Sequence, residues 1–139
     1  MKKSMAKVLC LVLALSAAGC GRATGDLNPD KWNADADSYE RVEIINGDNG
    51  EIITITDADS IEKLVEILNK GYEREQKHHS DGFRYGVNFC GKSDDNQKIT
   101  ILSENTIVYS DGYDYRLCLG GGIDLDYIDS LFEEADAFR

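Results

Sequence analysis

Residues 83–119 have the sequence FRYGVNFCGKSDDNQKITILSENTIVYSDGYDYRLCL. Runs of β-branched and aromatic residues recur here, and clusters of Gly, Asp, Asn and Ser that are typical of turns separate them. The runs lie at 83–90, 97–102, 106–109 and 113–119. Short turns join antiparallel neighbours, so the stretch predicts a four-stranded meander.

A β-hairpin is expected before this meander. The β-branched runs 39–45 and 51–56 are separated by the turn-forming sequence Asn46-Gly47-Asp48-Asn49-Gly50. Asn and Gly tolerate the positive φ angles that tight turns require, so this pattern predicts two paired strands.

Two helices are expected, one before the meander and one after it in the sequence. In 59–70 the apolar residues Ile61, Leu64, Val65 and Leu68 follow helical spacing. Either Asp57 or Asp59 can cap the start of this helix.

The second predicted helix begins after the Gly120–Gly122 break, with Asp124 as its cap. Residues 72–82 between the first helix and the meander are charged and show no period, so we expect a loop there.

The elements follow the order β-β-α-β-β-β-β-α, with about six strands. In an antiparallel sheet that carries both helices on one face, the apolar side of each helix and the apolar side of each strand face one common core. The sequence therefore predicts a small α+β domain over residues 39–139.

The N-terminal segment has the layout of an export signal. Lys2, Lys3 and Lys7 precede the apolar run Val8–Ala18, which is too short to span a membrane, and Ala17-Ala18-Gly19-Cys20 follows. The ending resembles the lipobox of bacterial lipoproteins, with Ala17 where Leu is commonest.

The lipobox resemblance implies cleavage after residue 19 and a diacylglycerol on the Cys20 thiol. Two acyl chains give stable anchoring, so we expect Cys20 to hold the protein at the cell membrane, facing the extracytoplasmic side. The alternatives are an ordinary secretory signal cut near Ala18 and a retained membrane helix. Residues 20–38 would form a flexible tether, with Trp32 either folded back or available to a partner.

The charge limits the classes of partner. The whole chain carries −11, and loss of the three signal lysines leaves 12 basic against 26 acidic residues, a charge of −14. Such a balance opposes binding to nucleic acid and to anionic lipid. It favours basic proteins or multivalent cations.

The cysteines of the domain are Cys90 and Cys118. Strand parity places both on the outer face of the sheet, where either a disulfide or two free thiols is possible. No Cys-x-x-Cys spacing is present, so redox activity is not expected.

We expect no metal site, cofactor or catalytic set. His78 and His79 have acidic neighbours, but nothing in the predicted loop holds the ligands on one face. The acidic turns lack the spacing of an EF-hand, and no nucleophile elbow, phosphate loop or zinc motif occurs. Tyr109, Tyr113 and Tyr115 can form either a binding surface or cross-strand pairs, and we favour the pairs.

The chain also resembles small lipoproteins of Gram-positive bacteria, through its lipobox and the Tyr127-Ile128 and Leu131-Phe132 pairs of its last helix. That resemblance implies a tethered α+β domain and no particular activity. The leading hypothesis is a non-enzymatic domain that binds a protein or an envelope component. A cation-binding or sensing lipoprotein is the alternative, and a small envelope hydrolase is third.

Overall fold

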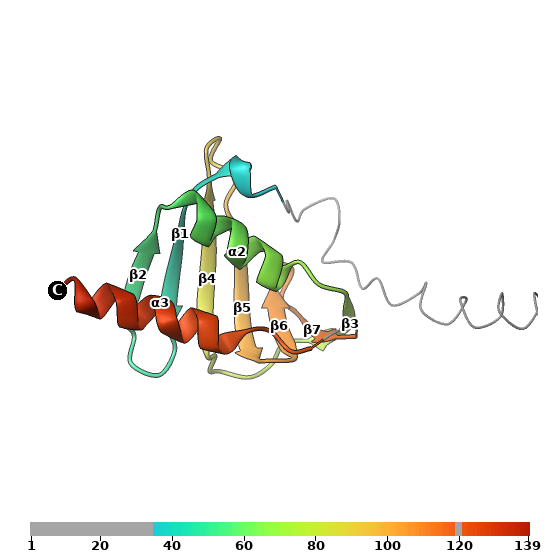
Figure 1. The fold of residues 1–139 in the computed structure, drawn as a ribbon. Coiled ribbons are helices and arrows are strands. Elements are labelled where there is room, and N and C mark those ends of the chain that lie inside the picture. Colours follow the sequence, from blue (N-terminus) through green and yellow to red (C-terminus); the bar gives the residue numbers. More distant parts are fainter. Residues whose placement is uncertain (1–34, 119–120) are drawn as a thin grey trace, which may run out of the picture.

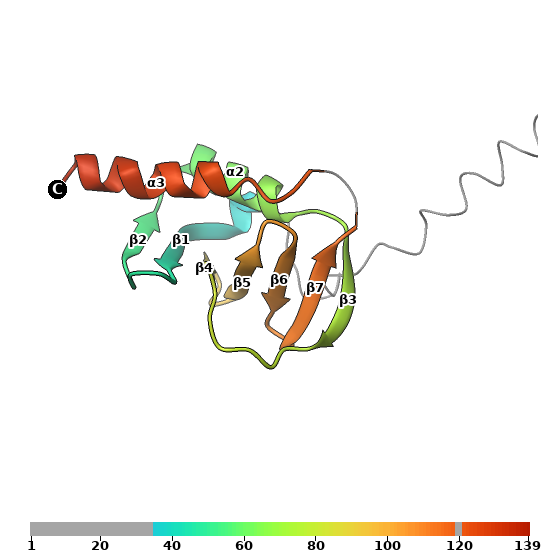
Figure 2. The same cartoon turned by 90° about the horizontal axis from the view of Figure 1, so that it is seen from below.

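The protein is a two-layer α+β sandwich. The computed structural model describes residues 35–118 and 121–139. A seven-stranded antiparallel sheet forms one layer, and α2 (Ala58–Leu68) and α3 (Leu125–Ala137) both lie on one of its faces (Figures 1 and 2). The expected fold class and the position of both helices are confirmed.

Neighbouring strands of the sheet follow the order β2-β1-β4-β5-β6-β7-β3. Every pair of neighbours is antiparallel. The strands are β1 (Tyr39–Asn46), β2 (Ile52–Ile55), β3 (Tyr72–Lys77), β4 (Tyr85–Gly91), β5 (Gln97–Ser103), β6 (Thr106–Tyr109) and β7 (Tyr113–Leu117).

Strand β3 corrects the sequence analysis, which expected a loop over 72–82. Tyr72–Lys77 pairs with β7 and forms one edge of the sheet. All residues of β3 after Tyr72 are exposed, so the strand shows no alternation of apolar and polar residues. The guanidinium carbon of Arg74 lies 4.8 Å from the centre of the Tyr113 ring, a cation–π contact with the neighbouring strand.

Both long helices begin where their caps predict. The carboxylate of Asp57 accepts a hydrogen bond from the Ser60 backbone N–H, and Asp124 accepts one from Tyr127. Asp57, and not Asp59, is therefore the cap of α2. A short 3-10 helix, η1 (Ala36–Ser38), precedes β1.

The core lies between the sheet and the helices. Alternate residues of the strands point to this face, and the apolar stripes of both helices cover them. The buried side chains include Val42, Ile44, Val87, Phe89, Ile99, Ile101 and Ile107 from the sheet, and Leu64, Leu68 and Ile128 from the helices.

Candidate functional site

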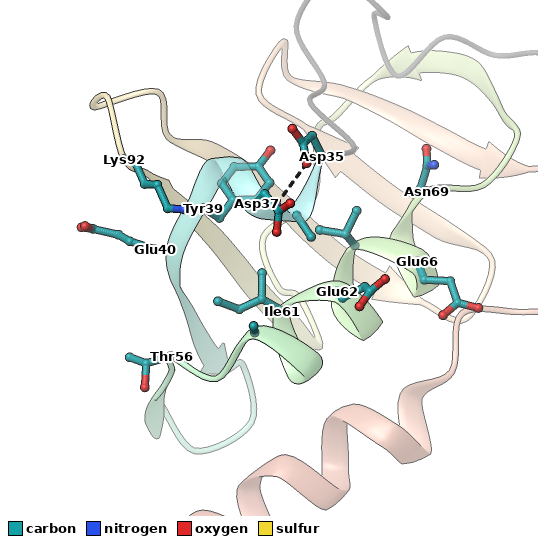
Figure 3. A pocket seen from close by; sticks show the side chains of 13 residues that line it. Asp35, Asp37, Tyr39, Glu40, Thr56, Ile61, Glu62, Glu66, Asn69 and Lys92 are labelled. Carbon is teal, nitrogen blue, oxygen red and sulfur yellow. Dashed lines mark hydrogen bonds between the residues drawn. The ribbon is translucent and has the colours of Figure 1, made fainter.

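A pocket of about 890 Å³ lies between α2, η1 and the start of β1 (Figure 3). Its apolar lining residues include Ile61 and Val65 on α2 and Tyr39 on β1, which are largely buried beneath the polar side chains. The pocket has the size of a ligand site. It is lined in part by Asp35, the first described residue, which falls within the predicted tether 20–38 and caps η1.

Acidic side chains dominate the polar lining of this pocket. Carboxylates come from η1, β1 and α2, against the single amine of Lys92, and they belong to Asp35, Asp37, Glu40, Glu62 and Glu66. Glu40 is neutralised in part by Arg41, at 2.6 Å. Within residues 35–118 and 121–139, the carboxylates of Asp37, Glu62 and Glu66 form no ion pair.

Hydrogen bonds hold η1 in place beside the pocket. The Asp35 carboxylate accepts from the backbone N–H of Asp37 at 3.1 Å, as Figure 3 shows. The backbone N–H of Lys92 donates to the Ser38 carbonyl at 3.0 Å, which joins the turn between β4 and β5 to η1.

Burial, together with the charges of Tyr109 and Asp35, raises the pKa of Tyr39 to about 12, so the Tyr39 hydroxyl in the pocket lining stays neutral.

The predicted lipidation residue, Cys20, lies outside the described residues, as do Trp32 and Gly120. Among the residues that the structure does describe, no helix has the length and apolar character needed to cross a membrane.

Cys90 and Cys118 are free thiols in the structure. Cys90 lies on β4 and Cys118 directly follows β7, so β5 and β6 separate them. Burial raises the pKa of both thiols, which lowers the fraction present as reactive thiolate at neutral pH.

Three of the residues around the predicted His78-His79 loop have partners other than a metal, and they are His78, Glu73 and Glu75. His78 Nδ1 lies 2.6 Å from Asp114 Oδ1 on β7. Glu73 and Glu75 both pair with Arg116, at 3.6 and 3.1 Å. Across the described ranges, no three His, Cys, Asp or Glu side chains gather closely enough to hold an ion.

One arrangement near His78 was not expected from the sequence. Ser80 Oγ lies 3.4 Å from His78 Nε2, while the other ring nitrogen faces Asp114. The order of contacts is that of a Ser-His-Asp triad. The serine is exposed, and its distance to the histidine exceeds the 2.6–3.2 Å usual for an activated nucleophile.

The tyrosines of β6 and β7 mainly build the core. Tyr109 and Tyr115 are buried and meet edge to face, with ring centres 6.4 Å apart. Their hydroxyls donate to Gln97 and Asp111 at 2.5 and 2.6 Å. These contacts agree with the structural role that we favoured.

The chain matches no family model, no curated protein and no solved structure. The pocket itself was missed by the sequence analysis. The available signal was the position of Glu62 and Glu66, which are four residues apart and therefore lie on one side of α2.

Proposed function

We propose that this protein is a lipid-anchored extracytoplasmic binding domain, held at the membrane through Cys20. Its acidic pocket takes a positively charged segment of a partner protein. The Ala17–Cys20 sequence supports the anchor, and the geometry of the pocket supports the choice of partner.

The carboxylates that lack an ion pair carry this proposal. Asp37 on η1 and the pair Glu62 and Glu66 on α2 lie on different sides of one concave surface. Lysine or arginine side chains entering between them would complete ion pairs that the described residues leave open. Ile61 and Val65 would contact the aliphatic part of such side chains.

Crosslinking on intact cells tests the anchor and the partner together. We expect the wild-type chain to remain with the membranes and to capture one basic protein. Cys20→Ala should release the chain from the membranes. A wild-type chain without lipid, or a captured partner that binds equally well after the three pocket carboxylates are neutralised, would contradict the proposal.

The cation-binding alternative rests on the same excess of acidic residues. Because the described side chains provide no cluster of three ligands, it has less support from the geometry. A rise in melting temperature at millimolar calcium, abolished by Glu62→Gln and Glu66→Gln together, would favour it over a protein partner.

The hydrolase alternative has the Ser80–His78–Asp114 contacts in its favour. A fluorophosphonate probe tests it directly, since only an activated serine reacts at an appreciable rate. Labelling of Ser80 that is lost in His78→Ala would support a hydrolase. Absence of labelling would contradict the hydrolase alternative.

A further inference from the structure

One edge of the sheet is built differently from the other. At the β3 edge, Glu73, Arg74, Glu75 and Lys77 are charged and exposed, as is usual for edges that must avoid pairing with other chains. At the opposite edge, β2 has the uncharged sequence Ile-Ile-Thr-Ile. Among the described residues, only β1 pairs with β2.

Exposed apolar side chains gather near β2. The described part of the chain has three large ones, and they are Ile52 at 57%, Phe83 at 37% and Phe138 at 93% exposure. Ile52 belongs to β2, beside a hollow of about 270 Å³.

The other two exposed side chains lie at the same end of the molecule. Phe83 packs against Gly47 in the turn between β1 and β2, where an added Cβ would come within 1.8 Å of the Phe83 carbonyl oxygen. Phe138 precedes Arg139, whose guanidinium lies 2.9 Å from the carboxylate of Glu51 at the start of β2. Phe83 and the Phe138-Arg139 end of α3 therefore lie near the β1–β2 turn, at the end of the sheet where Ile52 begins β2.

The backbone of β2 presents free hydrogen-bonding groups at this edge. The Asn46 N–H donates to the Glu51 carbonyl at 2.8 Å, and Ile53 is paired with Ile44. Because bonded and non-bonded pairs alternate in an antiparallel ladder, Ile53 bonds toward β1. Ile52 and Thr54 then direct their N–H and C=O groups outward.

We propose that β2 pairs antiparallel with β2 of a second copy of this chain, about a two-fold axis through Ile53. Ile52 of each copy then lies opposite Thr54 of the other, so the outward groups satisfy one another. The two sheets become continuous, and both pairs of helices lie on the same face.

The proposed strand register brings no like charges together, although the two chains as a whole repel each other. In this register Glu51 lies opposite Ile55, so no charged residue of the strand faces a like charge. Each copy without its signal lysines carries −14, and the repulsion between copies falls with added salt. Association is therefore expected to strengthen as the salt concentration rises.

Helix α3 supplies a further contact with the second copy. Figures 1 and 2 both show its C-terminal end extending past β2, beyond the edge of its own sheet. The C-terminal end of α3 lies near Glu51 of its own chain. In the proposed register Glu51 of one copy lies opposite Ile55 of the other, so the two Glu51 residues are offset by four residues, or about 13 Å, along the strands. The two α3 helices can therefore pass side by side, with Phe138 over the sheet of the other copy.

Disulfide trapping of the full chain in membranes tests this register. Residues of a hydrogen-bonded antiparallel pair have Cα atoms about 5.5 Å apart, within the range of a disulfide. After mild oxidation, the double variant Ile52→Cys and Thr54→Cys should form several times more dimer than either single variant. The matched pair Glu73→Cys and Glu75→Cys, at the other edge, should give only the background level.

Sedimentation of the full chain in detergent provides the second measurement. The wild type should have twice the mass of the chain, Ile52→Lys should be monomeric with an unchanged circular dichroism spectrum, and Gln76→Lys on β3 should remain dimeric. A monomeric wild type at every salt concentration, or trapping no greater than in the single variants, would overturn the proposal. Trapping to a protein of a different mass would also overturn it, because the edge would then serve another partner.

Discussion

Tyr85 on β4 donates a hydrogen bond from its hydroxyl to the carboxylate of Asp129 on α3. The same carboxylate lies 3.5 Å from the Arg84 guanidinium. The Tyr85 ring is buried and stacks on Phe132, with ring centres 5.9 Å apart. Helix α3 is therefore joined to the sheet by a charged hydrogen bond as well as by apolar packing.

Removing this hydrogen bond should lower the stability of the domain. Tyr85→Phe keeps the ring and deletes the donor, so we expect the free energy of unfolding to fall by about 1–2 kcal/mol in denaturant titrations. Tyr127→Phe is the control, because the Tyr127 hydroxyl has no hydrogen-bond partner among the described residues. Equal losses in both variants would show that the Asp129 contact does not stabilise the fold.

The cap of α2 gives a pH-dependent prediction. Asp57→Ala should cost about 1 kcal/mol of unfolding free energy at neutral pH, whereas Asp59→Ala should cost little. Hydrogen bonds from Ser60 lower the pKa of Asp57, so its ionised form stabilises the folded state. This contribution is complete above the ordinary aspartate pKa of about 4 and is lost as the pH falls through the lowered value. The difference between wild type and Asp57→Ala should therefore shrink in acid, and a constant difference down to the lowest measurable pH would contradict the assignment.

Tyrosine ionisation should limit stability at high pH. Burial is the main reason that the pKa values of Tyr39 and Tyr115 rise to about 12, and the hydrogen bond to Asp111 adds to the rise at Tyr115. Both stay neutral in the folded protein while an unfolded tyrosine ionises near pH 10. Their contribution is complete below about pH 10 and is lost as the pH rises toward 12. Tyr115→Phe should weaken this dependence in denaturant titrations at several alkaline pH values, and an unchanged dependence would count against it.

The strands with apolar alternation could be predicted from the sequence, and β3 could not. In β4, Tyr85, Val87 and Phe89 face the helices and carry the period of two. Strand β3 has solvent around almost all its side chains, so neither face imposes a pattern. Its pairing with β7 depends on residues far along the chain, so the local sequence of β3 does not predict it.

The candidate site was also beyond local pattern analysis. The pocket combines Asp37, Glu62 and Lys92 from three separate segments, and only the tertiary fold brings them together. The same reason explains His78. The sequence analysis expected His78 to lie in a loop without a metal site, and it could not identify the carboxylate that His78 contacts, which belongs to Asp114 on β7.

Binding of a labelled oligolysine peptide tests the charge of the pocket most directly. The full chain in detergent should bind this peptide at low salt. The triple variant Asp37→Asn, Glu62→Gln and Glu66→Gln should lose about tenfold in affinity, since each of the three ion pairs contributes roughly 0.5 kcal/mol and about 1.4 kcal/mol corresponds to a tenfold change.

The matched control removes the same charge from the exposed end of α3, through Glu133→Gln, Glu134→Gln and Asp136→Asn. Fluorescence anisotropy of the peptide should show wild-type affinity for this control and weak binding for the pocket variant. Equal weakening of both variants would mean that the peptide senses only the net charge of the protein, and would contradict a binding site in the pocket.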